Sequence, residues 1–124
     1  MAINRLRGDS TPLINGHGKK YETIAAKTIG ARLRPSSGAM VGAKGDMVTR
    51  GSLIETKTTT SETIPIKLEW LVKITGEALA AGKSPVVLLA FVLPTGRPRP
   101  VCSPEWVCIP KEVWQELQEA KNGS

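Results

Sequence analysis

One stretch decides the fold of this 124-residue chain: Gly45-Asp46-Met47-Val48-Thr49-Arg50-Gly51-Ser52-Leu53-Ile54-Glu55-Thr56-Lys57. Two runs rich in β-forming residues, 46–49 and 52–58, flank a central Arg-Gly pair, whose glycine favours a tight reversal. The stretch therefore predicts a β-hairpin. Because side chains alternate between the two faces of a strand, we expect Glu55 and Lys57 side by side on one face.

An amphipathic helix is predicted before this hairpin, at about residues 20–30. Apolar residues recur there at helical spacing, and Gly30 supplies a stop signal. Residues 1–18 are basic and contain several glycines but few apolar anchors, so we expect a flexible basic arm ahead of a single domain over 19–124. Residues 34–46 are rich in Gly and Ser, which predicts a loop or a ragged strand edge.

The C-terminal half predicts a helix over 66–81 that stops at Gly82, an apolar strand over 85–93, a short strand over 106–109 and a last helix beginning near Pro110. The predicted buried stripe of the first of these helices is Leu68, Leu71, Val72, Ile74, Ala78 and Leu79. The resulting order, α-β-β-α-β-β-α, indicates an α/β fold with a mixed β-sheet and flanking helices.

The composition favours a polyanionic partner. Seventeen Lys and Arg against eleven Asp and Glu give a net charge of +6, which suits nucleic acid or an anionic surface. No apolar run approaches the roughly 20 residues that cross a bilayer, and the first residues lead into no apolar signal core. We therefore expect a cytoplasmic protein without a membrane partner. The single histidine, His17, cannot build a His-rich zinc site and is expected in a surface loop.

Asp46 and Glu55 form the one spacing that implies a reaction. If Asp46 opens one strand of the hairpin and Glu55 lies in its partner, both carboxylates can converge on one hard cation, for which Mg²⁺ or Mn²⁺ suits oxygen ligands better than Zn²⁺. Lys57 could then orient an attacking water or neutralise charge in the transition state. The alternative is that Glu55 and Lys57 are solvated partners on an exposed hairpin face.

These residues resemble the PD-(D/E)xK nuclease superfamily, and within it the small archaeal-type Holliday junction resolvases. The motifs that carry the resemblance are Gly18-Lys19-Lys20-Tyr21-Glu22, Ser36-Ser37-Gly38, Lys44-Gly45-Asp46 and Leu53-Ile54-Glu55-Thr56-Lys57. The resemblance implies Asp46 and Glu55 as metal ligands, Glu22 as a supporting first-helix glutamate, and Lys57 as the catalytic lysine. It also implies an active-site serine, Ser36 or Ser37, of which Ser37 is favoured. Gly45 departs from the pattern, since the family name gives proline there.

The same resemblance implies a restriction-endonuclease-like core and a homodimer with two Mg²⁺-dependent sites, in which Mn²⁺ would substitute. Each site would cut one strand of a four-way DNA junction during recombination or repair, in the host cytoplasm if the protein is phage-encoded. Basic residues bracket the site and are candidate DNA contacts, together with Ser36: Arg5, Arg7, Lys19, Lys20, Arg32, Arg34 and Lys44.

Two other functions fit the sequence. One is a restriction-like or repair endonuclease acting on duplex or flap DNA, and the other is an inactive DNA-binding module of the same fold. Three tryptophans, Trp70, Trp106 and Trp114, are expected as core or dimer-interface anchors rather than as platforms for bases. Glu69 and Glu77 are expected on the solvent side of their helix.

Overall fold

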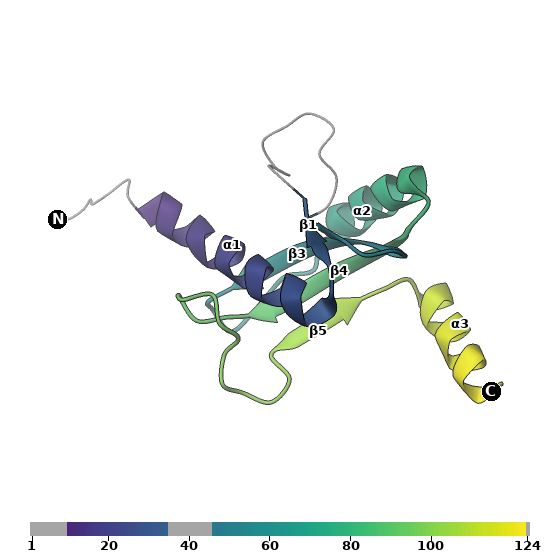
Figure 1. The fold of residues 1–124 in the computed structure, drawn as a ribbon. Helices are drawn as coiled ribbons and strands as arrows, with labels where there is room; N and C mark the ends of the chain where they lie inside the picture. The colour runs from purple at the N-terminus through teal and green to yellow at the C-terminus, as the bar shows by residue number, and fades with distance from the viewer. Residues whose placement is uncertain (1–9, 35–45, 124) are drawn as a thin grey trace.

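The computed structural model describes residues 10–34 and 46–123 (Figure 1). The elements in chain order are α1 (Ser10–Ile29), β1 (Arg32–Leu33), β2 (Met47–Val48), β3 (Ser52–Thr59), α2 (Leu68–Ala81), β4 (Ser84–Phe91), β5 (Glu105–Cys108) and α3 (Lys111–Asn122). The strands form one sheet in the order β1-β2-β3-β4-β5. Only β3 and β4 pair in parallel, while the other neighbours are antiparallel. The predicted α/β class with a mixed sheet is confirmed.

The predicted hairpin is confirmed as β2 and β3. Met47 pairs with Ile54 and Val48 with Leu53, so the reversal lies at Arg50-Gly51. A parallel pair needs a crossover connection, and α2 supplies it between β3 and β4. The strand over Arg32–Leu33 was not predicted, because two residues are too few to show an alternating pattern.

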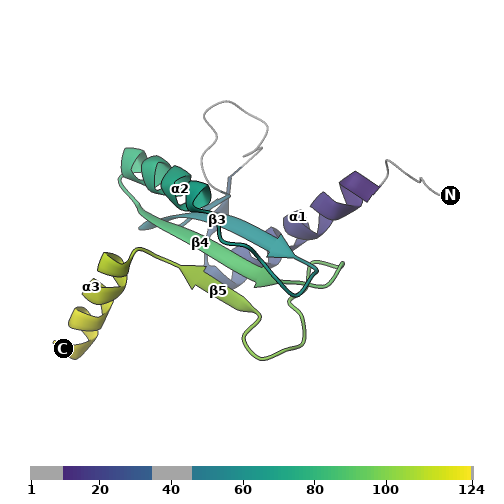
Figure 2. The same cartoon turned by 180° about the vertical axis from the view of Figure 1, so that it is seen from behind.

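The two long helices cover opposite faces of the sheet (Figures 1 and 2). The alternation along β3 sends Ile54 toward α1 and Leu53 toward α2. The α1-side cluster of buried residues is Tyr21, Ala25, Ala26, Met47, Ile54, Leu88, Ala90 and Val92. The α2-side cluster is Val48, Leu53, Ile74, Ala78, Val87 and Leu89. By the same alternation, Glu55 and Lys57 share the α2 side.

Both predicted helix stops are confirmed, but the start of α1 was predicted too late. Gly30 and Gly82 follow their helices with φ of +78° and +69°, a conformation that glycine adopts without strain. However, α1 begins at Ser10, so residues 10–18 are helical rather than part of an arm. His17 therefore lies on α1 and not in a surface loop, and its Nδ1 is 3.0 Å from the Thr58 Oγ1. The glycines near His17 indicated a loop, and the local sequence gives no sign of this contact with β3.

The predicted apolar stripe of α2 is only half right. Ile74 and Ala78 are buried, whereas Leu68, Val72 and Leu79 lie exposed. Part of the stripe thus faces away from the sheet, because a 14-residue helix over two strands buries a narrower face than the sequence offers. Trp106 and Trp114 are likewise more than half exposed, so they are not core anchors in this chain.

Gly96 allows the turn after β4 to approach α1 closely. It follows β4 in a turn with φ of +89°, and a Cβ there would lie 2.5 Å from the Lys20 Cβ and 3.0 Å from the Tyr21 backbone nitrogen. We expect Gly96→Ala to lower the free energy of unfolding by about 2–4 kcal/mol, since it combines a left-handed backbone with overpacking. Urea denaturation would measure this change.

A matched glycine provides the control for that measurement. Gly76 lies inside α2, and a Cβ added there would meet no heavy atom within 4 Å outside the helix's own backbone. Gly76→Ala should therefore raise the free energy of unfolding by about 0.5–1 kcal/mol. Equal effects of the two substitutions would contradict the close approach of the Gly96 turn to α1.

Candidate active site

Asp46 is fixed across the mouth of the β2–β3 hairpin. Its backbone N–H donates to the Ile54 carbonyl at 2.7 Å, and its Oδ2 accepts a hydrogen bond from the Thr56 backbone N–H at 2.6 Å. The carboxylate is therefore anchored at the residue that separates Glu55 from Lys57 on β3. A short hydrogen bond from a backbone N–H to a charged oxygen holds such a side chain firmly.

Glu55 and Lys57 form an ion pair on the α2 side of β3. The Lys57 Nζ lies 3.3 Å from the Glu55 Oε2, with the Glu55 side chain only 16 % exposed. The same ammonium lies 4.7 Å from the centre of the Trp70 ring, a distance at which a cation is attracted to the aromatic face. Lys57 is thus held between a carboxylate and an indole.

A polar cavity of about 210 Å³ opens beside this pair. Its lining comes from β3 and from one side of α2: Glu55, Lys57, Glu69, Trp70, Lys73 and Ile74. Glu69 is exposed, as predicted, and it also lines the edge of this cavity. Glu77 is more enclosed than expected, with a side chain 11 % exposed and its Oε2 3.9 Å from the Lys73 Nζ.

Burial and mutual repulsion act on three carboxyl groups, those of Glu22 on α1, Asp46 just before β2 and Glu55 on β3. Burial, followed by the negative charges of Asp46 and Glu55, raises the pKa of Glu22 to about 7, against a smaller lowering by Lys19. Burial and Asp46 likewise raise the pKa of Glu55, which Lys57 and Lys73 partly oppose. Three carboxyl groups from separate elements therefore share one electrostatic environment.

The arrangement is not a closed coordination shell. Within residues 10–34 and 46–123, no group of three or more His, Cys, Asp or Glu side chains is placed to hold a metal ion. What the fold brings together is a hydrogen-bonded carboxylate, Asp46, with Glu55 on the facing strand and Glu22 from α1 within electrostatic reach.

The predicted basic residues divide into those near the carboxylates and those outside the described residues. Lys19 and Lys20 are exposed on α1, within one turn of Glu22. Arg32 is exposed on β1, and the Arg34 backbone N–H donates to the Asp46 carbonyl at 3.0 Å. The predictions on Arg5, Arg7, Ser36, Ser37 and Lys44 lie outside the described residues.

Trp70 and Lys73 are the site residues that sequence reasoning missed. Both lie on α2 at positions three residues apart, so they face the same side of the helix. A signal for them exists in the sequence, because a helix that crosses between two parallel strands must turn one face toward them. Trp70 packs against the α2-side cluster, as predicted for a core anchor, but its contact with Lys57 was not predicted.

The burial of Glu22, together with the nearby negative charges, predicts an unusual pH dependence of stability without divalent metal. The folded pKa of Glu22, about 7, exceeds its ordinary 4.5, so between these pH values the folded state binds more protons than the unfolded state. The free energy of unfolding should therefore fall as pH rises from about 5 to 8, by about 1–2 kcal/mol after allowance for solvent screening. Urea denaturation in EDTA would measure this slope.

The control for that slope is Glu22→Gln, which removes the titrating group and should flatten much of it. The same variant should be more stable than the wild-type protein at pH 8. Wild-type stability that rises steadily between pH 5 and 8 would contradict the burial of Glu22 beside these charges.

Comparison with protein-family models, with curated proteins and with solved structures gave no match. In the part of the chain that the structure describes, no helix combines the length and the apolarity needed to cross a membrane. The geometry and chemistry of the carboxylate site are thus the basis for a functional proposal.

Proposed function

We propose that this protein is a metal-dependent endodeoxyribonuclease that cleaves four-way DNA junctions. The observation that carries the proposal is the hairpin itself. It fixes the Asp46 carboxylate on the Thr56 N–H and places Glu55 and Lys57 on either side of that residue, with their charged groups 3.3 Å apart. Paired carboxylates with an adjacent lysine suit hydrolysis of a phosphodiester.

The residues present fit a hard divalent cation by their chemistry. Glu22, Asp46 and Glu55 offer only oxygen donors, the preference of Mg²⁺ and Mn²⁺. Burial, and after it the repulsion from Asp46, raises the pKa values of Glu22 and Glu55, and a bound cation would favour their charged forms. Asp46 and Glu55 would hold the ion and Glu22 would support it. When bound, the cation would lower the pKa of a water molecule and stabilise charge on the phosphate.

Lys57 has the geometry of a group that acts on the phosphate or on the attacking water. Its ammonium is only partly exposed and is restrained by Glu55 and by the Trp70 ring, so it loses little freedom when a substrate arrives. Lys19, Lys20 and Arg32 are exposed near the carboxylates and would contact the flanking DNA backbone.

The choice of a junction as substrate rests on the resemblance to archaeal-type Holliday junction resolvases. The order of α1, a three-strand antiparallel meander, α2 and a parallel strand β4 supports a PD-(D/E)xK core. A homodimer would carry a net charge of about +12, twice the +6 of one chain, and its binding to DNA should weaken steeply with salt.

An inactive DNA-binding module is the second candidate. The observation that favours it is the Glu55–Lys57 ion pair, because a carboxylate already neutralised by lysine is a weaker metal ligand. The described residues also form no three-ligand group. This module would bind junctions with the same basic residues and would cut none of them.

Cleavage of a synthetic four-way junction and of a linear duplex of matching sequence separates these functions. We expect paired nicks in the junction with Mg²⁺ and none with EDTA. Equal cutting of both substrates would instead indicate a general duplex or repair endonuclease. Tight junction binding without cutting under Mg²⁺ or Mn²⁺ would overturn the proposed activity and leave the binding module.

A further inference from the structure

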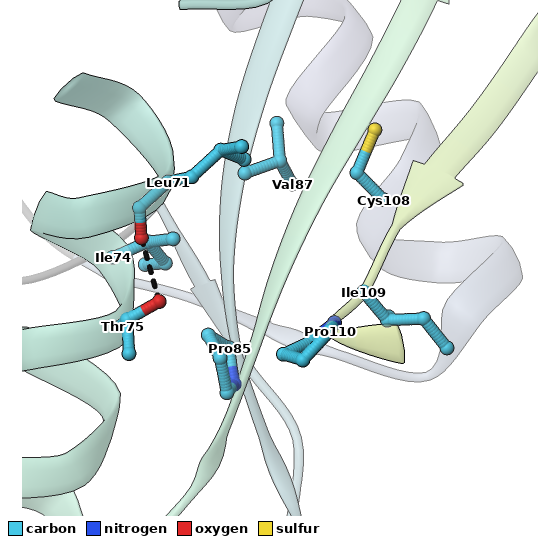
Figure 3. A pocket seen from close by; sticks show the side chains of 8 residues that line it. All are labelled: Leu71, Ile74, Thr75, Pro85, Val87, Cys108, Ile109 and Pro110. Carbon is cyan, nitrogen blue, oxygen red and sulfur yellow. Dashed lines mark hydrogen bonds between the residues drawn. The ribbon is translucent and has the colours of Figure 1, made fainter. Parts of the chain in front are cut away.

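An apolar groove lies beside α2 on the same face of the sheet as the polar cavity, with which it shares Ile74. It has a volume of about 220 Å³ and opens between α2, β4 and the end of β5 (Figure 3). The residues that line it are Leu71, Ile74, Thr75, Pro85, Val87, Cys108, Ile109 and Pro110. Pairing of Cys108 with Val87 and of Trp106 with Leu89 puts both β5 side chains on this side of the sheet. Trp106, which is 58 % exposed, extends the apolar surface.

The helix α3 is an amphipathic element whose apolar side is not buried within the described residues. Val113, Trp114 and Leu117 lie on one side of it at helical spacing, yet none of its residues is buried, and Trp114 and Leu117 are 53 % and 57 % exposed. Both views of the fold show α3 directed away from the sheet (Figures 1 and 2). An isolated helix of 12 residues is marginal in water, so its apolar side needs a covering surface.

The connection to β5 keeps α3 out of its own groove. Only Ile109 and Pro110 separate the last residue of β5 from the first residue of α3, and Pro110 is extended, with φ of −59° and ψ of 144°. Proline fixes its own φ and restricts the residue before it. Both residues also line the groove, so the helix leaves from the groove's edge instead of lying along it.

We infer that α3 of a second copy of this chain occupies the groove, and that the two copies exchange α3 helices reciprocally around a two-fold axis. The groove is smaller than the usual 300–1,000 Å³ of a small-molecule site, whereas apolar side chains of one helix face would fill it. Three glutamates and two lysines give α3 a net charge of −1, which leaves +7 on the rest of a chain whose total is +6. An acidic helix is thus attracted to a second basic body.

The exchange buries the apolar side of α3 and the groove in two equivalent contacts, one for each copy. Twelve residues form a helix about 18 Å long, and a two-fold arrangement covers two grooves with two helices. The same contact would cover Trp106 and Trp114, whose exposure is otherwise costly. This inference names the interface of the homodimer in the proposed function, and it holds with or without nuclease activity.

Light scattering on a sizing column tests the exchange with two variants and their controls. The wild-type chain should run as a dimer of twice 13.3 kDa. Trp114→Glu, on the apolar side of α3, and Thr75→Arg, on the groove wall, should each give folded monomers by circular dichroism. Gln115→Glu and Ala80→Arg introduce the same charges on the opposite sides of α3 and α2, and should stay dimeric.

Mixing the two monomeric variants distinguishes exchange between chains from packing within one chain. In a mixed dimer, one α3 and one groove are intact and meet each other, while the introduced carboxylate and the introduced guanidinium meet as opposite charges at the second contact. The mixture should therefore recover the dimer. A monomeric wild-type protein, a failure of the mixture to dimerise, or loss of dimer in both controls would overturn the inference, whatever the outcome of the cleavage assay.

Discussion

Glu55→Gln should lower junction cleavage by about 10³-fold or more without weakening the fold. The amide cannot replace a carboxylate as a cation ligand, and a metal's stabilisation of transition-state charge is worth several kcal/mol. The stability of the variant should instead rise at pH 8, by up to about 1 kcal/mol, because burial and Asp46 oppose the charge of Glu55. A variant that gains stability and loses activity shows that the native side chain serves the reaction at a cost in stability.

Asp46→Asn should show the same loss of cleavage, while the Asn side-chain oxygen can still accept the hydrogen bond from Thr56. Junction binding should persist in both variants, since each removes a negative charge that faces DNA. The matched control is Glu62→Gln, an exposed carboxylate before α2, which should cut at the wild-type rate. Unfolding of Asp46→Asn and Glu55→Gln at neutral pH would show that both residues serve the structure.

The next largest effect is expected from Lys57→Gln, at about 10²-fold slower cleavage. The substitution removes the cation 3.3 Å from Glu55, and preorganised charge at a phosphate is commonly worth this factor. Because Lys57 lowers the pKa of Glu55, its loss should also move the acidic limb of the pH–rate profile to higher pH. Rates measured from about pH 6 to 9 would show both effects.

Lys73→Gln is the matched control for Lys57. Lys73 lines the same cavity and also lowers the pKa of Glu55, but its side chain is 66 % exposed and its Nζ lies 3.9 Å from Glu77. Its loss should slow cleavage by no more than about threefold. Equal effects of the two substitutions would mean that Lys57 contributes only general positive charge.

The sequence predicted the hairpin and the helix ends because their signals are local. A central Arg50-Gly51 pair between β-forming runs determines a reversal, and Gly30 and Gly82 have the left-handed φ that their positions suggested. The start of α1 was predicted too late because Gly16 and Gly18 indicate a loop locally, whereas the chain there is helical and His17 contacts Thr58 of β3.

The candidate site also has a part that local sequence predicts and a part that depends on tertiary packing. Strand alternation was enough to place Glu55 beside Lys57, and the antiparallel register brings Asp46 opposite them. The contact of Trp70 with Lys57 was not predicted, because the rotation of α2 over β3 depends on packing across the sheet. The exposed stripe of α2 was misjudged for the same reason, since helical periodicity does not say how much of an apolar face finds a partner.

Titration with Mn²⁺ followed by calorimetry tests the central claim, that Asp46 and Glu55 hold a divalent cation. The wild-type protein at pH 8 should bind Mn²⁺ saturably. Asp46→Asn and Glu55→Gln should lose this binding while they remain folded, and Glu62→Gln should keep it. Equal Mn²⁺ binding by all four proteins, or none by the wild-type protein, would contradict the claim.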